Sequence, residues 1–200
     1  MKKNTVYELA AAAVMTAVLC VLAPMTIPIG PIPVTLATLV LYLSVYVLRT
    51  RSALISCALY LLLGAFGLPV FSGWAGGFAK LAGPTGGYLA GYLFLVLISG
   101  LFVAKSARLR YPEGVSPRIK ALLGTAFAVL GMLLGTAACY IFGTAWFMVQ
   151  TGSALPYALS VCVLPFIPLD LAKIVFAAIA GRLLRAALTK AGLLRTGTGS

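Results

Sequence analysis

Asp170 and Lys173 are the two residues of this sequence that are best suited to holding a polar ligand. They lie three residues apart at the start of an apolar segment, in a chain with only three acidic residues. A charged side chain in hydrocarbon is costly unless it is paired or faces a polar ligand. The spacing puts both on one face of a helix, and a carboxylate just after Pro168 is favoured by the positive end of the helix dipole. We therefore expect a ligand site, with an ion pair that merely anchors the helix end as the alternative.

The composition is that of an integral membrane protein. Of 200 residues, 62% are hydrophobic and 9% are charged, and the mean hydropathy is +1.09, whereas soluble proteins carry about 25% charged residues. Crossing the hydrocarbon layer takes about 20 apolar residues per helix, so six crossings fill more than half the chain and leave only short connections. We expect one all-α domain over residues 1–200, built as a six-helix membrane bundle.

The apolar runs predict where the helices lie. The first run, after Lys2 and Lys3, also resembles a secretory signal peptide, but it is long for one and is assigned to the first span. Between the last two spans, the apolar centre of residues 143–168 ends at prolines and is too short to cross, which predicts a short re-entrant or interfacial helix. The six predicted spans are residues 6–23, 35–49, 52–71, 86–104, 119–142 and 169–187.

The basic residues predict the orientation, because Lys and Arg mark cytoplasmic loops. Three of the loops, residues 24–34, 72–85 and 143–168, contain only Lys80. The opposite loops and the two ends carry Lys2, Lys3, Arg49, Arg51, Lys105, Arg108, Arg110, Arg118, Lys120, Arg182, Arg185, Lys190 and Arg195. We expect a multi-pass protein of the plasma membrane with both termini in the cytoplasm, as an even number of spans requires.

Several functions are disfavoured by what the sequence contains. The net charge of +12 comes from basic clusters between apolar runs, without interleaved aromatics, so we expect no nucleic-acid partner. The chain has no histidine, and its four cysteines lie apart in apolar segments, which predicts no metal site. It has no phosphate-binding P-loop motif, so ATP hydrolysis would need a partner. With a single candidate acid near the outer face, we expect no enzyme activity.

The two loops before the fourth span have the composition of a lid. Residues 24–33 contain four prolines, which favour a stiff, extended segment, and residues 72–87 are rich in glycine, which permits close backbone approach to a ligand. Glycine and proline that only punctuate helices are the alternative. The aromatic residues nearby would form either the walls of a pocket or an interfacial belt: Trp74, Phe78, Tyr88, Tyr92, Trp146 and Phe147. A small, largely apolar molecule with N–H donors for Asp170 and an acceptor or anion for Lys173 would fit.

Four segments, in chain order, resemble the successive signatures of one family. They are residues 27–35 (IPIGPIPVT), 60–73 (YLLLGAFGLPVFSG), 83–88 (GPTGGY) and 164–173 (LPFIPLDLAK). Together they are similar to the BioY family, the biotin-binding S components of energy-coupling-factor (ECF) transporters. The resemblance extends from the first predicted span to the sixth.

The resemblance implies a membrane protein that captures biotin outside and releases it inside when docked on a transmembrane coupling subunit with two cytoplasmic ATPases. No cofactor is implied besides the ligand biotin. Asp170 and Lys173 match the family's acid and lysine of the last helix. Asp170 would accept a hydrogen bond from a ureido N–H, while Lys173 would either donate to the ureido carbonyl or pair with Asp170. The other expected site residues are Thr35, Ser72, Gly73, Gly86, Tyr88 and Trp146.

The family's A-x-x-x-A motif for docking on the coupling subunit is matched by Ala13 and Ala17. Small residues at this spacing let helix backbones approach closely. The glycines at positions 87, 91, 131 and 135 have the same spacing and predict internal packing. Two other functions stay open: a proton-coupled secondary transporter that uses Asp170 as its carrier, and an S component for another vitamin. The first is disfavoured because the chain shows no inverted repeats.

Overall fold

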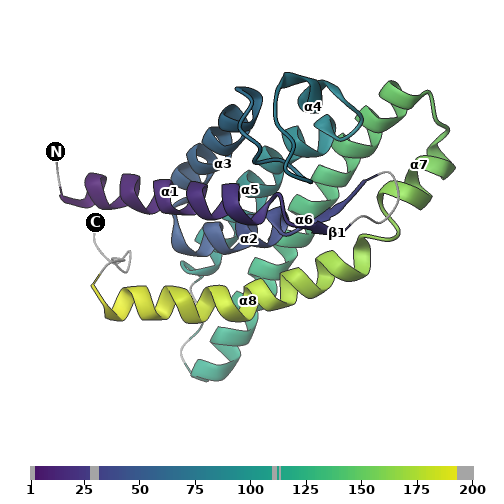
Figure 1. The fold of residues 1–200 in the computed structure, drawn as a ribbon. Coiled ribbons are helices and arrows are strands. Elements are labelled where there is room, and N and C mark those ends of the chain that lie inside the picture. The colour runs from purple at the N-terminus through teal and green to yellow at the C-terminus, as the bar shows by residue number, and fades with distance from the viewer. Residues whose placement is uncertain (1–2, 28–31, 110–111, 113, 193–200) are drawn as a thin grey trace.

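The computed structural model describes residues 3–27, 32–109, 112 and 114–192, and these residues form a helical fold with one small antiparallel strand pair (Figure 1). In chain order the elements are α1 (Lys3–Leu22), β1 (Thr26–Ile27), β2 (Val34–Thr35), α2 (Ala37–Val47), α3 (Thr50–Ala65), α4 (Phe78–Ala82), α5 (Gly86–Ser106), α6 (Pro117–Thr151), α7 (Leu155–Cys162) and α8 (Ile167–Lys190).

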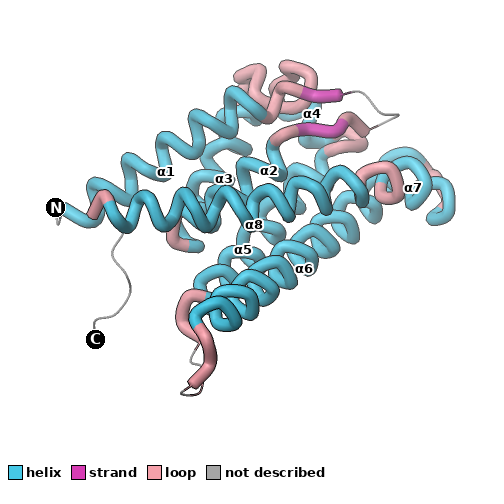
Figure 2. The backbone as a smooth tube through the Cα atoms, turned by 90° about the horizontal axis from the view of Figure 1, so that it is seen from below, coloured by secondary structure: helices cyan, strands magenta, loops and turns pink. Residues whose placement is uncertain are grey.

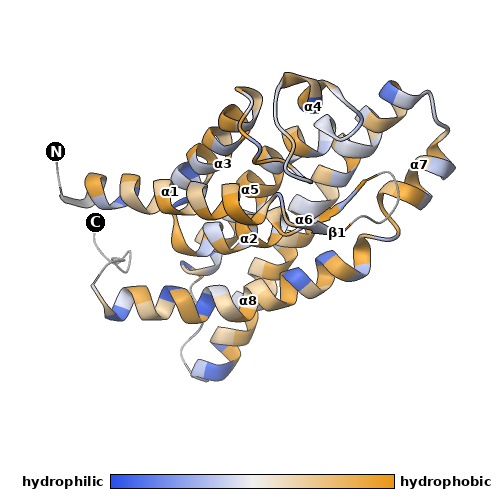
Figure 3. Ribbon diagram, in the orientation of Figure 1, coloured by the Kyte–Doolittle hydropathy of each residue, from blue (hydrophilic) through white to orange (hydrophobic). Residues whose placement is uncertain are grey.

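The helices fall where the apolar runs predict them, which confirms the helical class. Most of the helical surface is apolar (Figure 3). By length and composition, α5 and α6 can each cross a membrane, and the pair α7 and α8, bent by 46°, can do so together. The helix α2 has 11 residues, or about 16 Å at 1.5 Å per residue, roughly half the hydrocarbon thickness. Six membrane crossings therefore stay a prediction.

Two predicted boundaries are wrong. The third span was expected to reach residue 71, but α3 ends at Ala65, and Gly67 then takes a positive φ of 100° that terminates helical geometry. The fifth was expected to end before Gly143, but α6 continues to Thr151 and is closed by Gly152 in the left-handed conformation. Gly143 therefore lies inside α6 rather than at its end. The glycine makes room for the ring of Tyr88, with which an added Cβ would collide.

Glycine also sets the close packing of α5 against α6, as their spacing predicted. An added Cβ at Gly91 would lie 2.9 Å from the sulfur of Cys139, and one at Gly135 would lie 2.7 Å from Oγ of Ser99. Cβ atoms at Gly87 and Gly131 would collide with side chains across the same interface. Internal packing is therefore confirmed as a role of these glycines.

The two loops expected to form a lid lie side by side over one end of the helices. In the first, β1 pairs with β2, with Thr26 opposite Thr35; residues 28–31 of this loop lie outside the described residues. The second loop contains α4 and is joined to the first by a hydrogen bond from the Gly73 N–H to the Pro24 carbonyl (3.1 Å). Figure 2 shows the strand pair next to the loops around α4 and above the start of α2.

Candidate functional site

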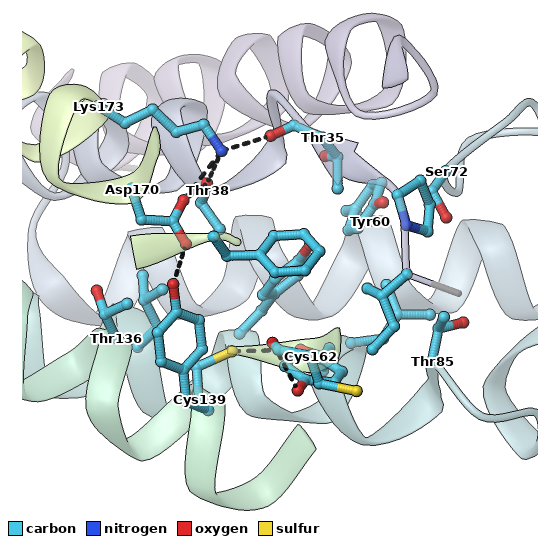
Figure 4. A pocket seen from close by; sticks show the side chains of 18 residues that line it. Thr35, Thr38, Tyr60, Ser72, Thr85, Thr136, Cys139, Cys162, Asp170 and Lys173 are labelled. Atoms are coloured by element: carbon cyan, nitrogen blue, oxygen red, sulfur yellow. Dashed lines mark hydrogen bonds and ion pairs between the residues drawn. The ribbon is translucent and has the colours of Figure 1, made fainter. Parts of the chain in front are cut away.

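A cavity lies where the first turns of α2 and α8 meet α5 and α6, beneath the two loops. It leaves about 60 Å³ to the centres of water-sized spheres. Most of its wall is apolar or aromatic, including Tyr60, Leu89, Tyr92, Leu95 and Phe166. The two charged side chains lie at one end with Thr35 and Thr38, whereas Ser72 and Thr85 lie across the cavity from them (Figure 4).

Lys173 lies at this polar end and pairs with Asp170. Its Nζ is 2.9 Å from Oδ1 of Asp170, and it also donates to the Thr35 carbonyl (2.9 Å) and to Oγ1 of Thr38 (3.1 Å). An ammonium has three N–H donors, so all three are used. Of the two roles expected for Lys173, the structure therefore contains the pairing with Asp170, and the lysine also ties α8 to β2 and α2.

The carboxylate of Asp170 is buried, with 5% of the residue exposed. Its Oδ1 accepts from Lys173 and from the Thr38 hydroxyl (3.3 Å), and its Oδ2 accepts from the Tyr140 hydroxyl (2.6 Å). A carboxylate offers about four acceptor positions, so one position on Oδ2 stays available. The site can therefore accept one more N–H donor while keeping its internal hydrogen bonds.

The local sequence explains how these groups are placed. Helix α8 begins at Ile167 with Pro168 in its first turn, where proline is tolerated because no N–H partner is needed. This puts Asp170 at the positive end of the helix dipole. In β2, Oγ1 of Thr35 accepts from the Ala37 N–H at the start of α2 (2.7 Å). The Thr35 side chain is thus turned toward α2, and its carbonyl faces Lys173.

The hydroxyl groups of the wall residue Tyr88 and of Tyr42, a buried neighbour of the wall residue Thr136, are satisfied within the protein. Tyr42 bonds Thr136 (2.5 Å), and because the Thr136 hydroxyl donates to the Met132 carbonyl, Tyr42 is the donor. Tyr88 donates to the Cys162 carbonyl (3.2 Å) and lies 3.1 Å from Oγ1 of Thr144. Tyr88 therefore presents mainly its ring to the cavity, and the charged groups that could recognise a ligand are those of the Asp170 end.

Five of the predicted site residues line this one cavity, although they come from four separate parts of the chain. They are Thr35, Ser72, Tyr88, Asp170 and Lys173. Tyr92, predicted as a wall residue, lines it as well.

The structure places three other predicted site residues outside the cavity wall. Gly73 joins the two loops, and Gly86 packs on the backbone of Leu81, where a side chain would collide. The Nε1–H of Trp146 donates to the Gly83 carbonyl (2.9 Å), which fastens α6 to the turn before α5. Each contacts other protein atoms and none lines the cavity, so their contact with a ligand stays a prediction.

The remaining predicted wall residues are also elsewhere. Trp74 and Phe78 lie on the surface of the second loop, 62% and 74% exposed, and Phe147 is buried in the core. Composition alone could not separate these rings from Tyr88 and Tyr92, because an aromatic side chain suits a core, a surface belt and a pocket equally well.

Thr38 and Tyr140 contact Asp170 but were missed from the sequence. Each carried a weak signal. Thr38 lies three residues after Thr35, and Tyr140 lies four residues after Thr136, so each follows another polar residue by one helical turn. A buried tyrosine also usually finds a partner for its hydroxyl.

The predicted docking residues Ala13 and Ala17 are both exposed on one face of α1. A neighbouring face of α1 packs on α3, where the Thr16 hydroxyl bonds Oγ of Ser56 (2.9 Å). The small-residue face of α1 is thus presented to the surroundings rather than used in the packing of the described residues.

Comparison with known proteins gives consistent matches. The sequence model of the BioY family matches residues 1–190. The biotin transporter BioY of Thermotoga maritima is 34% identical over 172 residues, which cover 86% of this chain and 92% of that protein. The biotin transporter BioY2 of Lactococcus lactis subsp. cremoris is 35% identical over 191 residues, covering 94% and 96%. A crystal structure of the S-component for biotin from an ECF-type ABC transporter matches with a TM-score of 0.78 and 28% identity, covering 93% and 94%.

Proposed function

The chain belongs to the BioY family, and we propose that it is the membrane-embedded, biotin-binding S component of an ECF-type ABC transporter. It is a transport subunit rather than an enzyme. The observation that carries this function is the buried Asp170–Lys173 pair at the polar end of an apolar cavity, in a chain whose relatives are named biotin transporters.

Biotin has the chemistry that this cavity would select. Its ureido ring offers two N–H groups and a carbonyl, its sulfur-containing ring is apolar, and its valerate tail ends in a carboxylate. In our proposal a ureido N–H donates to the remaining acceptor position on Oδ2 of Asp170, next to the Tyr140 hydroxyl. Lys173 holds the other oxygen of this carboxylate, Oδ1, through its own pairing. The apolar ring packs on Tyr88, Tyr92 and Leu95.

Binding requires the cavity to widen. Its volume of about 60 Å³ is well below the roughly 300–1,000 Å³ of pockets that enclose small molecules. The most easily moved part of the wall comes from the two loops, which contribute Ile32, Pro33, Ser72 and Thr85. We therefore assign the loops the role of a lid that opens outward to admit the vitamin and closes over it.

Transport in this proposal follows the arrangement expected from the sequence. The six predicted spans cross the plasma membrane with both termini in the cytoplasm, and the lid faces outside. A transmembrane coupling subunit docks on the face of α1 that carries Ala13 and Ala17, and two cytoplasmic ATPases supply the energy. The exposure of both alanines supports this assignment. The bound molecule is biotin, and no further cofactor takes part.

Calorimetric titration of the purified protein with biotin tests the assignment, with thiamine and riboflavin as controls. We expect one biotin bound per chain and no heat from the other two vitamins. Binding of thiamine or riboflavin in place of biotin would make the chain an S component for another vitamin. In proteoliposomes, uptake that continues without ATP and collapses with the proton gradient would favour the secondary transporter.

A further inference from the structure

A second cavity lies at the opposite end of the helices from the biotin site. It leaves about 440 Å³ to the centres of water-sized spheres, and its wall contains three cationic side chains, Lys120 of α6 and Arg182 and Arg185 of α8. Figures 1 and 2 both show the first half of α6 diverging from the last half of α8. This divergence leaves a space that the end of α2 only partly fills.

Tyr46 of α2 also lines this second cavity, and none of the residues that the structure describes pairs with its hydroxyl. The residue is 5% exposed, and its hydroxyl oxygen is the one fully buried side-chain polar atom without a hydrogen bond within residues 6–27, 32–109, 112 and 114–192. The ring is held against Gly181 of α8, and Arg182 and Arg185 line the same cavity as Tyr46. An unpaired buried hydroxyl is unfavourable, so this position calls for an acceptor atom that the described residues do not supply.

The chain cannot neutralise these three cations with its own acidic side chains. It has three acidic residues; Asp170 is paired with Lys173 and Glu8 with Arg49. The third, Glu113, lies outside the described residues, and one carboxylate would still leave two positive charges. Arg182 is held in place by the Ala121 carbonyl and the Thr125 hydroxyl, which uses only part of its five donors.

We propose that this second cavity binds the phosphate group of an anionic lipid. A phosphate oxygen would accept from the Tyr46 hydroxyl, while the guanidinium of Arg185 and the ammonium of Lys120 would pair with its charge. The surroundings favour a lipid over a free ion, because exposed apolar side chains on both helices flank the cavity: Leu122 and Leu123 on α6, and Leu183 and Leu184 on α8. Acyl chains can lie along these side chains while the headgroup enters.

Basic residues at this end are also expected of any membrane protein, as a signal of orientation. That role needs charge alone. It accounts for neither the cavity nor the unpartnered hydroxyl of Tyr46, and a phosphate group accounts for both.

The test is the thermal stability of the full-length protein in neutral detergent, with phosphatidylglycerol or phosphatidylcholine added in mixed micelles. Native mass spectrometry of the same samples counts the bound lipids. The variants are Arg185→Gln, which removes one charge, and Tyr46→Phe, which removes only the hydroxyl. Lys105→Gln is the matched control, because this exposed lysine at the end of α5 belongs to the same basic end but does not line the cavity. Inorganic phosphate at matched ionic strength is the arm that tests a free anion.

Phosphatidylglycerol, but not phosphatidylcholine, should raise the melting temperature and give one retained lipid. Arg185→Gln should weaken this effect about fivefold, Tyr46→Phe should weaken it as well, and Lys105→Gln should leave it unchanged. If inorganic phosphate alone raised the melting temperature with the same dependence on the three variants, the cavity would bind a soluble phosphate rather than a lipid. The proposal is overturned if neither anion acts, or if all three variants respond like the natural chain. Biotin binding by each variant establishes that it is folded.

Discussion

The Tyr140 hydroxyl donates a 2.6 Å hydrogen bond to Oδ2 of Asp170, from a position 30 residues earlier in the chain. The bond links the middle of α6 to the first turn of α8 and fixes the oxygen that Lys173 does not hold. The carboxylate is thereby oriented by three elements, because Thr38 of α2 contacts it too. A ligand N–H meets an acceptor whose direction is already set.

Asp170→Asn should abolish measurable biotin binding, because the amide presents a weaker acceptor and leaves Lys173 without its counter-charge. Breaking a buried ion pair costs about 3–5 kcal/mol, so the free energy of unfolding should fall as well; both side chains are at most 13% exposed. Titration calorimetry and thermal unfolding measure the two effects. Glu8→Gln, which breaks the exposed pair with Arg49, should cost less than about 1 kcal/mol.

The double variant Asp170→Asn with Lys173→Met separates stability from binding. Removing both charges leaves no unpaired ion, so much of the lost stability should return, while biotin binding should stay absent. Recovery of binding together with stability would show that the charges serve only the fold.

Tyr140→Phe should weaken biotin binding about tenfold. The variant keeps the ring in the cavity wall but removes the hydrogen bond that orients Oδ2 of Asp170, and a bond to a charged group is worth about 1.5–3 kcal/mol. Calorimetry measures the change in Kd. Tyr157→Phe is the control, because this exposed tyrosine of α7 does not line the cavity; an equal loss there would contradict a special role for Tyr140.

Ala13→Leu and Ala17→Leu should abolish biotin uptake by the assembled transporter without changing biotin binding by the isolated chain. The added side chains would keep a partner helix away from α1. Radiolabelled uptake in cells and binding to the purified protein give the two readouts. Ala145→Leu places the same side chain at an exposed position of α6 and should leave both unchanged. Full uptake by the α1 variants would refute the docking assignment.

Gly143→Ala should lower both stability and biotin affinity, because its Cβ would push the Tyr88 ring, a wall of the cavity. Overpacking of this kind costs about 1–3 kcal/mol. Gly131→Ala would push Phe102, which does not line the cavity, so it should lower the melting temperature with biotin affinity intact. Equal affinity in both variants would mean that the position of Tyr88 does not matter for the ligand.

The sequence predicts most helices because apolar runs and their punctuation are local properties. The Asp170–Lys173 pair was also predictable, since residues three apart share a helix face whatever the tertiary structure. Its hydrogen-bond partners were not. Thr38 and Tyr140 reach the carboxylate only because α2 and α6 pack against the start of α8. Spacing along one helix shows which residues share a face but not which residues of another helix that face contacts.

The roles of the glycines also could not be predicted from local sequence. Gly143 and Gly152 look alike in sequence, but the first lies inside α6 where it admits Tyr88, and the second ends the helix with a φ of 66°. Only the packing of α5 against α6 distinguishes the two. The position of Trp146 was unpredictable for a similar reason. Its exposed ring and its bond to Gly83 arise because α6 extends beyond residue 142.

The hydrogen bonds of Lys173 fasten α8 to neighbouring parts of the chain. Two of them hold Thr35 and Thr38, and a ligand that donates to Oδ2 of Asp170 leaves both in place, so β2 and α2 stay fastened to α8 when the pocket is occupied. Only residues 23–25 separate β1, the partner of β2, from α1. The wall of the pocket is thereby tied through β1 to the helix that carries Ala13 and Ala17, so a movement of that helix would be passed to the wall.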